Sequence, residues 1–137
     1  MTQAGFPDTL KNIIDALNAA LPLAYVGDEL PPSTALERRL PIVLVQDVPG
    51  GADDIPWQAA TGPLTDIFSA DFYVLASNRR DSRELAARVR GIIWSLLWND
   101  TVGARHIVER SGWSRVPDWN PNVKREHAEY DFHISRH

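Results

Sequence analysis

The chain has 137 residues, of which 44% are hydrophobic and 23% are charged, a composition typical of a single soluble globular domain. It contains no cysteine, which excludes disulfides and thiolate metal sites, and no apolar run approaches the roughly 20 residues of a membrane-spanning helix. The formal net charge of −4 argues against simple electrostatic binding to nucleic acid.

The N-terminal segment predicts an amphipathic helix. Its first residues, MTQAGFPDTL, lack a basic region followed by an apolar stretch, so we expect no signal peptide and a protein made in the cytoplasm. Asp8 or Thr9 can cap the helix, and Pro22 ends it. One side of this helix should be apolar, because five residues recur at helical spacing: Leu10, Ile13, Ile14, Leu17 and Leu21.

Two extended segments follow. A short one is expected around residues 24–26, and adjacent prolines then indicate a loop at 30–33. Residues 41–48 (PIVLVQDV) are nearly all apolar or β-branched, which predicts a strand covered on both faces. The glycines and aspartates of residues 49–54 predict a turn.

The middle of the chain predicts a long strand and a second helix. Residues 65–76 (TDIFSADFYVLA) alternate with a period of two, so that Phe68, Phe72 and Val74 share one face. The helix is expected to begin at Asp81 or Ser82 and to continue to Leu97.

This second helix carries two apolar stripes where a surface helix needs only one. Leu85, Val89, Ile92 and Leu96 should face the sheet, while Ala87, Gly91, Trp94 and Trp98 lie roughly opposite. Either another part of the same chain covers the second stripe, or it forms a subunit interface.

The C-terminal third predicts two strands and a loop between them. Residues 105–110 form one candidate strand, and residues 127–136 alternate more cleanly, with Tyr130 and Phe132 on the core side. The segment 111–124 contains two tryptophans and two prolines and is expected to be a stiff loop. It either folds back over the core or presents a preshaped contact surface.

The order of these elements predicts the fold class. Helix, strands, helix and strands are most simply packed as an α+β domain spanning residues 1–137. Its mainly antiparallel β-sheet would carry two α-helices packed on one face.

The sequence contains few residues in patterns that indicate catalytic chemistry. The chain has no phosphate-binding loop, dinucleotide-binding glycine motif, zinc-protease motif or nucleophile elbow. Four side chains of the last predicted strand share one face and form a conceivable site for a divalent ion, although an exposed polar strand face explains them better: His127, Glu129, Asp131 and His133. Asp53 and Asp54 adjoin two glycines in a predicted loop, where nothing desolvates them for acid–base catalysis. We therefore expect no enzymatic activity, no cofactor and no bound metal.

The distribution of charge is uneven along the chain. Three basic and ten acidic residues lie up to Phe72, whereas eleven basic and eight acidic residues follow from Tyr73 onward. This is either chance decoration of a solvated surface or a molecule whose faces have opposite sign and associate head to tail with copies of itself.

The whole pattern resembles the tail terminators of long-tailed bacteriophages, notably the actinobacterial-phage type. The matching features are the opening helix, PIVLVQDV at 41–48, the strand–helix unit TDIFSADFYVLASNRRDSRELAARVRGIIWSLL at 65–97, and GWSRVPDWNPNVKREHAEYDFHIS at 112–135. The resemblance covers nearly the full length of the chain. It rests on the order of the elements and on their residue patterns, without a single diagnostic motif.

The resemblance implies a virion structural protein at the tail–neck junction. Such a protein forms a homo-oligomeric ring, usually a hexamer, that caps the tail-tube protein, stops its polymerisation and offers a joining surface to head-completion or connector proteins. DNA would pass through the lumen without specific binding, which an acidic lumen favours.

The candidate residues of such a ring fall into two groups. The lumen-facing candidates are Asp47, Asp53, Asp54 and Asp66. The candidates for contacts between subunits or with partners are Arg79, Arg80, Trp94, Trp98, Trp113, Arg115 and Trp119. A contact between strand edges is an equally open way to join subunits.

Three other functions stay open at this point. The nearest is another neck component, a head–tail connector or a tail-completion protein. The others are a small α+β enzyme with a pocket between helices and sheet, and a binding module for a small ligand or peptide.

Overall fold

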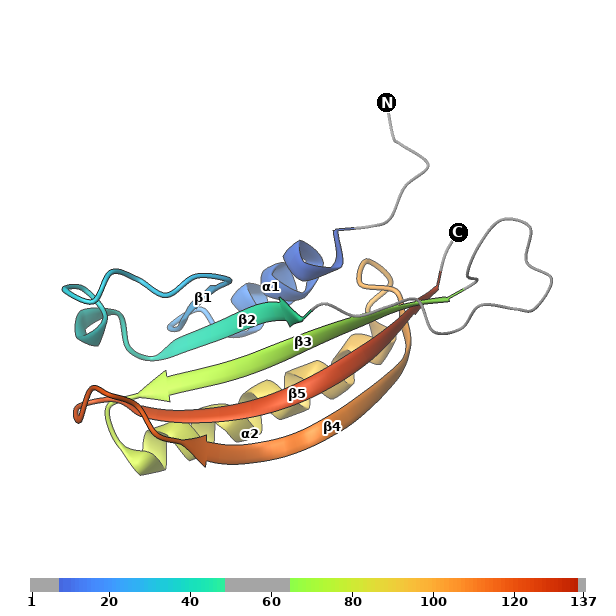
Figure 1. Ribbon diagram of the computed structural model, residues 1–137. Coiled ribbons are helices and arrows are strands. Elements are labelled where there is room, and N and C mark those ends of the chain that lie inside the picture. The colour runs from blue at the N-terminus through green and yellow to red at the C-terminus, as the bar shows by residue number, and fades with distance from the viewer. Residues whose placement is uncertain (1–7, 49–64, 136–137) are drawn as a thin grey trace.

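The computed structural model describes residues 8–48 and 65–135 and forms one layer of sheet with one layer of helix (Figure 1). Its elements are α1 (Thr9–Ala20), β1 (Tyr25–Gly27), η1 (Glu37–Arg39), β2 (Ile42–Val48), β3 (Thr65–Ala76), α2 (Arg79–Ser95), η2 (Leu96–Trp98), β4 (Ala104–Val116) and β5 (Lys124–Ser135). The strands form a five-stranded sheet in the order β1-β2-β3-β5-β4. β1 runs parallel to β2 and all other neighbours are antiparallel, so the predicted α+β class is confirmed.

Both helices cover the same face of the sheet. Figure 1 shows α1 near β1 and β2, and α2 running behind β3 and β5, in agreement with the contacts between these elements. The main core lies between the layers, where Phe72, Tyr130 and Phe132 are fully buried. Their rings meet at inclined angles, with Phe72 and Tyr130 edge to face at a centroid distance of 5.4 Å, a preferred aromatic geometry.

The first helix is confirmed with its predicted cap and apolar side. Asp8 is the N-cap, and its carboxylate accepts a hydrogen bond from the Lys11 amide at 3.1 Å. Ile13, Leu17 and Leu21 are buried against the core. The other two predicted apolar positions, Leu10 and Ile14, are half-buried and pack against the same cluster.

The second helix begins earlier than predicted. It starts at Arg79, because the side-chain oxygen of Asn78 accepts from the Asp81 amide at 2.9 Å and so takes the N-cap position. The predicted start at Asp81 or Ser82 is therefore wrong by two or three residues.

The predicted loop at 111–124 is partly wrong as well. Residues 111–116 continue β4, which pairs with β5 through three register irregularities, between Ala104 and His106, between Glu109 and Ser111, and between Ser111 and Ser114. Such bulges let a strand accept Gly112 without ending. Only residues 117–123 connect β4 to β5.

Candidate functional site

Within residues 8–48 and 65–135, the second face of the sheet carries no α-helix. Over β3 and β5 this face presents a set of mostly polar side chains, called here the open face: Ser69, Asp71, Tyr73, His127, Glu129 and Asp131. The residues that the structure describes cover this side of the sheet at one end. There Leu36, from the segment before η1, packs on Ile42, Leu75 and Val123. Residues 42–45 are buried on both faces, as predicted for the strand at 41–48, but Gln46 and Asp47 are exposed, so the prediction is wrong for the end of the strand.

Short-range contacts hold the open face together. The imidazole Nε2 of His127 lies 2.8 Å from a carboxylate oxygen of Asp71, and the ring of Tyr73 lies 4.7 Å from that of His127. The hydroxyl of Ser69 donates to Asp131 at 2.7 Å, and Arg110 approaches Asp131 at 3.5 Å. These contacts hold together a polar surface that carries three carboxylates, with the guanidinium of Arg110 beside Asp131 and that of Arg125 over the Tyr73 ring.

The four residues proposed as a conceivable divalent site do lie on this side of the sheet. Three of them, however, contact different partners: His127 contacts Asp71, and Asp131 contacts Ser69 and Arg110. The ring of His133 lies 5.1 Å from that of His106. Within residues 8–48 and 65–135, no group of three or more His, Asp or Glu side chains is arranged to hold a metal ion.

The helix-covered side contains a polar cluster around the buried Tyr130. Its hydroxyl donates to Glu109 in a short hydrogen bond and accepts from the indole Nε1 of Trp113 at 3.0 Å. Arg90 of α2 pairs with Glu109 through two contacts of 2.8 and 3.2 Å. The cluster joins α2, β4 and β5, so it ties the helix to the outer strand.

Hydrogen bonding and burial shift the pKa values of Glu109 and Tyr130 in this cluster. The hydrogen bond from Arg90 is the largest influence on Glu109 and holds the pKa of that carboxyl below its usual value. Burial, followed by the hydrogen bond to Glu109, raises the pKa of the Tyr130 phenol well above its usual value.

The variant Tyr130→Phe should lower the free energy of unfolding by about 1–3 kcal/mol at neutral pH, because it leaves Glu109 and Trp113 each short of a partner. The parent protein should also lose stability as the pH rises above about 10. There the phenol ionises in the unfolded chain but stays protonated in the folded one, at a cost of about 1.4 kcal/mol per pH unit. Urea unfolding from pH 7 to 11 tests both effects. If Tyr130→Phe loses as much free energy of unfolding above about pH 10 as the parent protein does, the role given to Tyr130 is wrong.

The contact candidates divide into covered and exposed groups. Trp94 packs edge-on against Tyr130 at 6.1 Å, and Trp113 donates to the Tyr130 hydroxyl, so the same chain partly buries both. Trp98 at the end of η2 is 85% exposed, and Trp119 in the β4–β5 turn is 79% exposed.

The two exposed tryptophans lie at opposite ends of the long axis of the sheet. Trp98 closes η2, shortly before β4 begins, whereas Trp119 follows the end of β4. Of the two tryptophans in the second apolar stripe, Trp94 packs within the chain and Trp98 is exposed.

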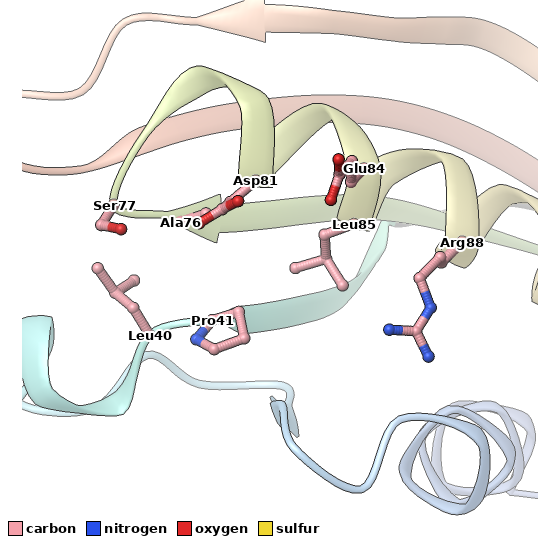
Figure 2. Close-up of a pocket in the computed structure, with 8 residues that line it drawn as sticks. All are labelled: Leu40, Pro41, Ala76, Ser77, Asp81, Glu84, Leu85 and Arg88. Carbon is pink, nitrogen blue, oxygen red and sulfur yellow. The ribbon is translucent and has the colours of Figure 1, made fainter.

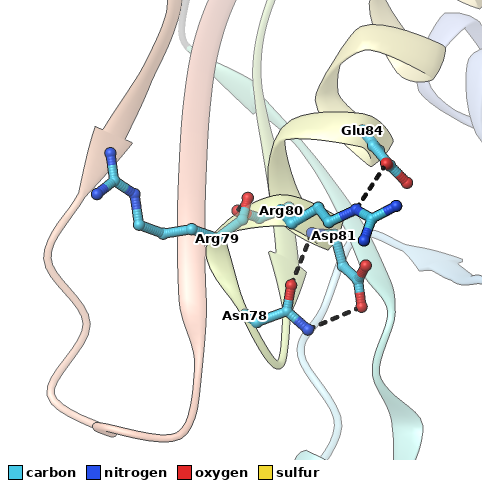
Figure 3. Close-up of polar contacts among 6 residues, drawn as sticks. Asn78, Arg79, Arg80, Asp81 and Glu84 are labelled. Carbon is cyan, nitrogen blue, oxygen red and sulfur yellow. Dashed lines mark hydrogen bonds and ion pairs between the residues drawn. The ribbon is translucent and has the colours of Figure 1, made fainter.

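The arginine candidates are exposed as well. Figure 3 shows Arg79 pointing away from the Asn78–Asp81 contact, while Arg80 lies against Glu84 at 3.3 Å. Arg115 is exposed on β4. In the part of the chain that the structure describes, neither Arg79 nor Arg115 forms an ion pair with a carboxylate.

The lumen candidates lie apart from the open face. Asp47 pairs in register with Ala70, and Asp66 with Ile134, so both share the helix-covered side of the sheet, at its end. Asp53 and Asp54 lie outside the described residues. The acidic residues that the open face does present were not predicted to face the lumen, although the alternation of β3 and β5 was the signal for them: Asp71, Glu129 and Asp131.

Two further observations bear on function. No helix of the described chain is long and apolar enough to cross a membrane. Neither a scan against protein-family models nor a search of the curated proteins found a match to this chain.

Proposed function

We propose that this chain assembles edge to edge into a closed ring that terminates the tail tube of a long-tailed bacteriophage. The observation that carries this proposal is the one-sided cover of the sheet. Both helices lie on one face (Figure 1). Among the described residues, no strand pairs with the outer edge of the 13-residue strand β4, nor with residues 45–48 of β2 beyond β1.

Such a layout favours side-by-side association. A long unpaired strand edge is a template for pairing with another chain. The two edges of one sheet are different, so pairing between them is head to tail and closes into a ring when the rotation per copy is right. The regular stretch from His106 to Glu109 offers β4 an uninterrupted run for such pairing.

The dimensions suit a DNA-conducting ring. Five strands about 4.8 Å apart give each copy roughly 24 Å of sheet width, so six copies would form a cylinder of sheet roughly 45 Å across. Inward-facing side chains of roughly 5 Å on each side would leave a hole of about 35 Å. In this arrangement the helices form the outer layer and the open face lines the lumen.

The chemistry of the open face agrees with passage of DNA. Its carboxylates would repeat around the lumen, and like charge repels the phosphate backbone. In this ring the lumen-facing residues are Asp71, Glu129 and Asp131, whereas Asp47 and Asp66 belong to the outer layer at the ring's end.

The partners of the ring follow from the same role. One end would sit on the tail-tube protein, and the other would meet a head-completion or connector protein at the tail–neck junction. The protein works here as a structural component and not as an enzyme.

An experiment on tube growth tests this role. The purified chain is added to the polymerising tail-tube protein of the phage that carries it, and tube lengths are measured by electron microscopy. We expect shorter tubes bearing a ring at one end. Tubes of unchanged length without such a cap would contradict the proposal.

A further inference from the structure

A row of arginines on α2 faces strands β4 and β5. Arg79, Arg83 and Arg90 are four and seven residues apart, so they recur on one side of the helix. Arg90 pairs with Glu109 of β4 at 2.8 Å, and Arg83 approaches Glu126 of β5 at 3.6 Å. Two of the three arginines therefore have a carboxylate opposite them on the sheet.

Arg79 continues this row at the start of α2. It lies one turn before Arg83, and Figure 3 shows its side chain directed away from Asp81 and Glu84. The side chain is exposed. Among residues 8–48 and 65–135, no carboxylate pairs with it. The third arginine of the row thus has no acidic partner in the described chain.

Arg115 approaches the same end of the helix from the sheet. It lies opposite Glu126 in the β4–β5 register, so both side chains leave the sheet on one face, with Cβ atoms about 5 Å apart. That face is the one covered by α2, because Glu126 accepts a hydrogen bond from the Ser82 hydroxyl at 3.4 Å. Arg115 is exposed, and it too lacks a carboxylate partner in the part of the chain that the structure describes.

These residues form an arginine cluster, defined here as Arg79, Arg83 and Arg115. Its only carboxylate is Glu126, so three positive charges and one negative charge leave a net charge of +2. The Glu126 side chain is only 2% exposed, and its Oε1 accepts no hydrogen bond. The buried carboxylate thus lies beneath the cluster, while two exposed guanidiniums stay available to an external anion. Guanidinium groups bind carboxylates and phosphates through paired hydrogen bonds.

The location of the cluster favours a protein carboxylate over a DNA phosphate. The cluster lies on the helix-covered side of the sheet, which faces outward in the proposed ring. DNA would pass along the open face, on the other side of the sheet. A protein that meets the end of the ring can reach the cluster, whereas DNA inside the lumen cannot.

We propose that Arg79 and Arg115 together bind a carboxylate of an acidic partner protein. This carboxylate completes the row of arginine–carboxylate contacts that Arg90 and Arg83 form within the chain. The choice of a protein partner rests on the proposed ring, whereas the anion site itself does not. The contact marks the end of the ring where α2 begins and β4 ends as an end that docks on an acidic surface.

Two double variants that remove the same charge test this site. Arg79→Ala with Arg115→Ala removes the two exposed guanidiniums of the cluster. The control, Arg88→Ala with Arg105→Ala, removes two exposed arginines elsewhere. Figure 2 shows Arg88 of α2 beside the hollow lined by Leu40 and Pro41, away from β4. Arg105 lies at the other end of the sheet, where β4 begins.

The probe is a fluorescently labelled peptide of six glutamates, and the readout is fluorescence anisotropy. At about 0.1 M salt, where charges more than about 10 Å apart are screened, the cluster variant should bind the peptide at least tenfold more weakly than the parent. The control should lose less than threefold. Urea unfolding should show that both double variants stay folded, because all four side chains are exposed.

Three results would overturn the carboxylate site. Equal losses in the two double variants would mean that binding follows net charge alone. Absence of binding by the parent up to about 1 mM peptide would mean that the cluster holds no carboxylate. Tighter binding of labelled duplex DNA, lost in the cluster variant, would identify a phosphate site.

Sedimentation separates this inference from the proposed ring. The cluster variant should form rings at the same concentration as the parent, because both side chains leave the face of the fold and not its strand edge. Loss of rings in this variant alone would assign the arginines to the subunit contact and overturn the inference. If the parent stays monomeric yet binds the peptide through these arginines, the ring is wrong and the carboxylate site stands.

Discussion

Replacing Phe72 by alanine should lower the free energy of unfolding by about 3–5 kcal/mol, the largest stability effect that we expect from a single substitution. Phe72 is fully buried at the centre of the sheet and touches the rings of Tyr130 and Phe132 at centroid distances of 5.4 and 6.0 Å. The substitution therefore removes transfer free energy and leaves a cavity between the layers.

The matched control is Phe68→Ala on the same strand. Phe68 is half-buried and has a more distant ring contact, 6.3 Å from Phe132, so its loss should cost less than half as much. Urea unfolding followed by circular dichroism gives both values. Equal losses would contradict a core centred on Phe72.

Reversing one charge on the open face should change how the assembled ring treats DNA. Glu129 lies directly opposite Asp71 in the β3–β5 register. Glu129→Lys replaces a carboxylate, which repels DNA phosphates, by an ammonium group in every copy. Around a lumen of several copies this should raise affinity for duplex DNA at least tenfold at low salt. The gain should fall steeply with added salt, as expected for phosphate contacts.

The control carries the same change of charge on the outer layer. Asp15 is exposed on α1 and pairs with Lys11 at 2.7 Å, so Asp15→Lys alters net charge without altering the open face. Fluorescence anisotropy with a labelled duplex should detect tighter binding only for Glu129→Lys. An equal gain for both variants would mean that the open face does not line the path of DNA.

Strong periodicity explains what the sequence could predict of the fold. The strand at 65–76 has the predicted bounds because strict alternation continues to Ala76 and serine and asparagine follow. The first helix was equally clear, since Asp8 and five apolar positions agree. Local pattern and tertiary packing favour the same structure in both segments.

The errors arose where two local signals competed. Asn78 and Asp81 are both good capping residues, and the extended backbone at Asn78 decides between them. Two tryptophans and two prolines indicated a loop at 111–124, but pairing with β5 extends β4 through its bulges to Val116. Tertiary pairing outweighs turn propensity in this strand.

The polar cluster around Tyr130 could not be predicted from the sequence. Arg90, Glu109 and Trp113 are brought to Tyr130 by the packing of α2 and by the irregular β4–β5 register. No spacing rule encodes such contacts. The open face, by contrast, could be predicted from the alternation of β5 together with the packing of both helices on one face of the sheet.

The native mass of the purified chain, followed by negative-stain images of its main species, tests the central claim most directly. The account predicts a closed ring of about six copies with a central hole, in equilibrium with monomer at low concentration. A particle with the mass of one 15.3 kDa chain at every concentration, and no ring in the images, would contradict it.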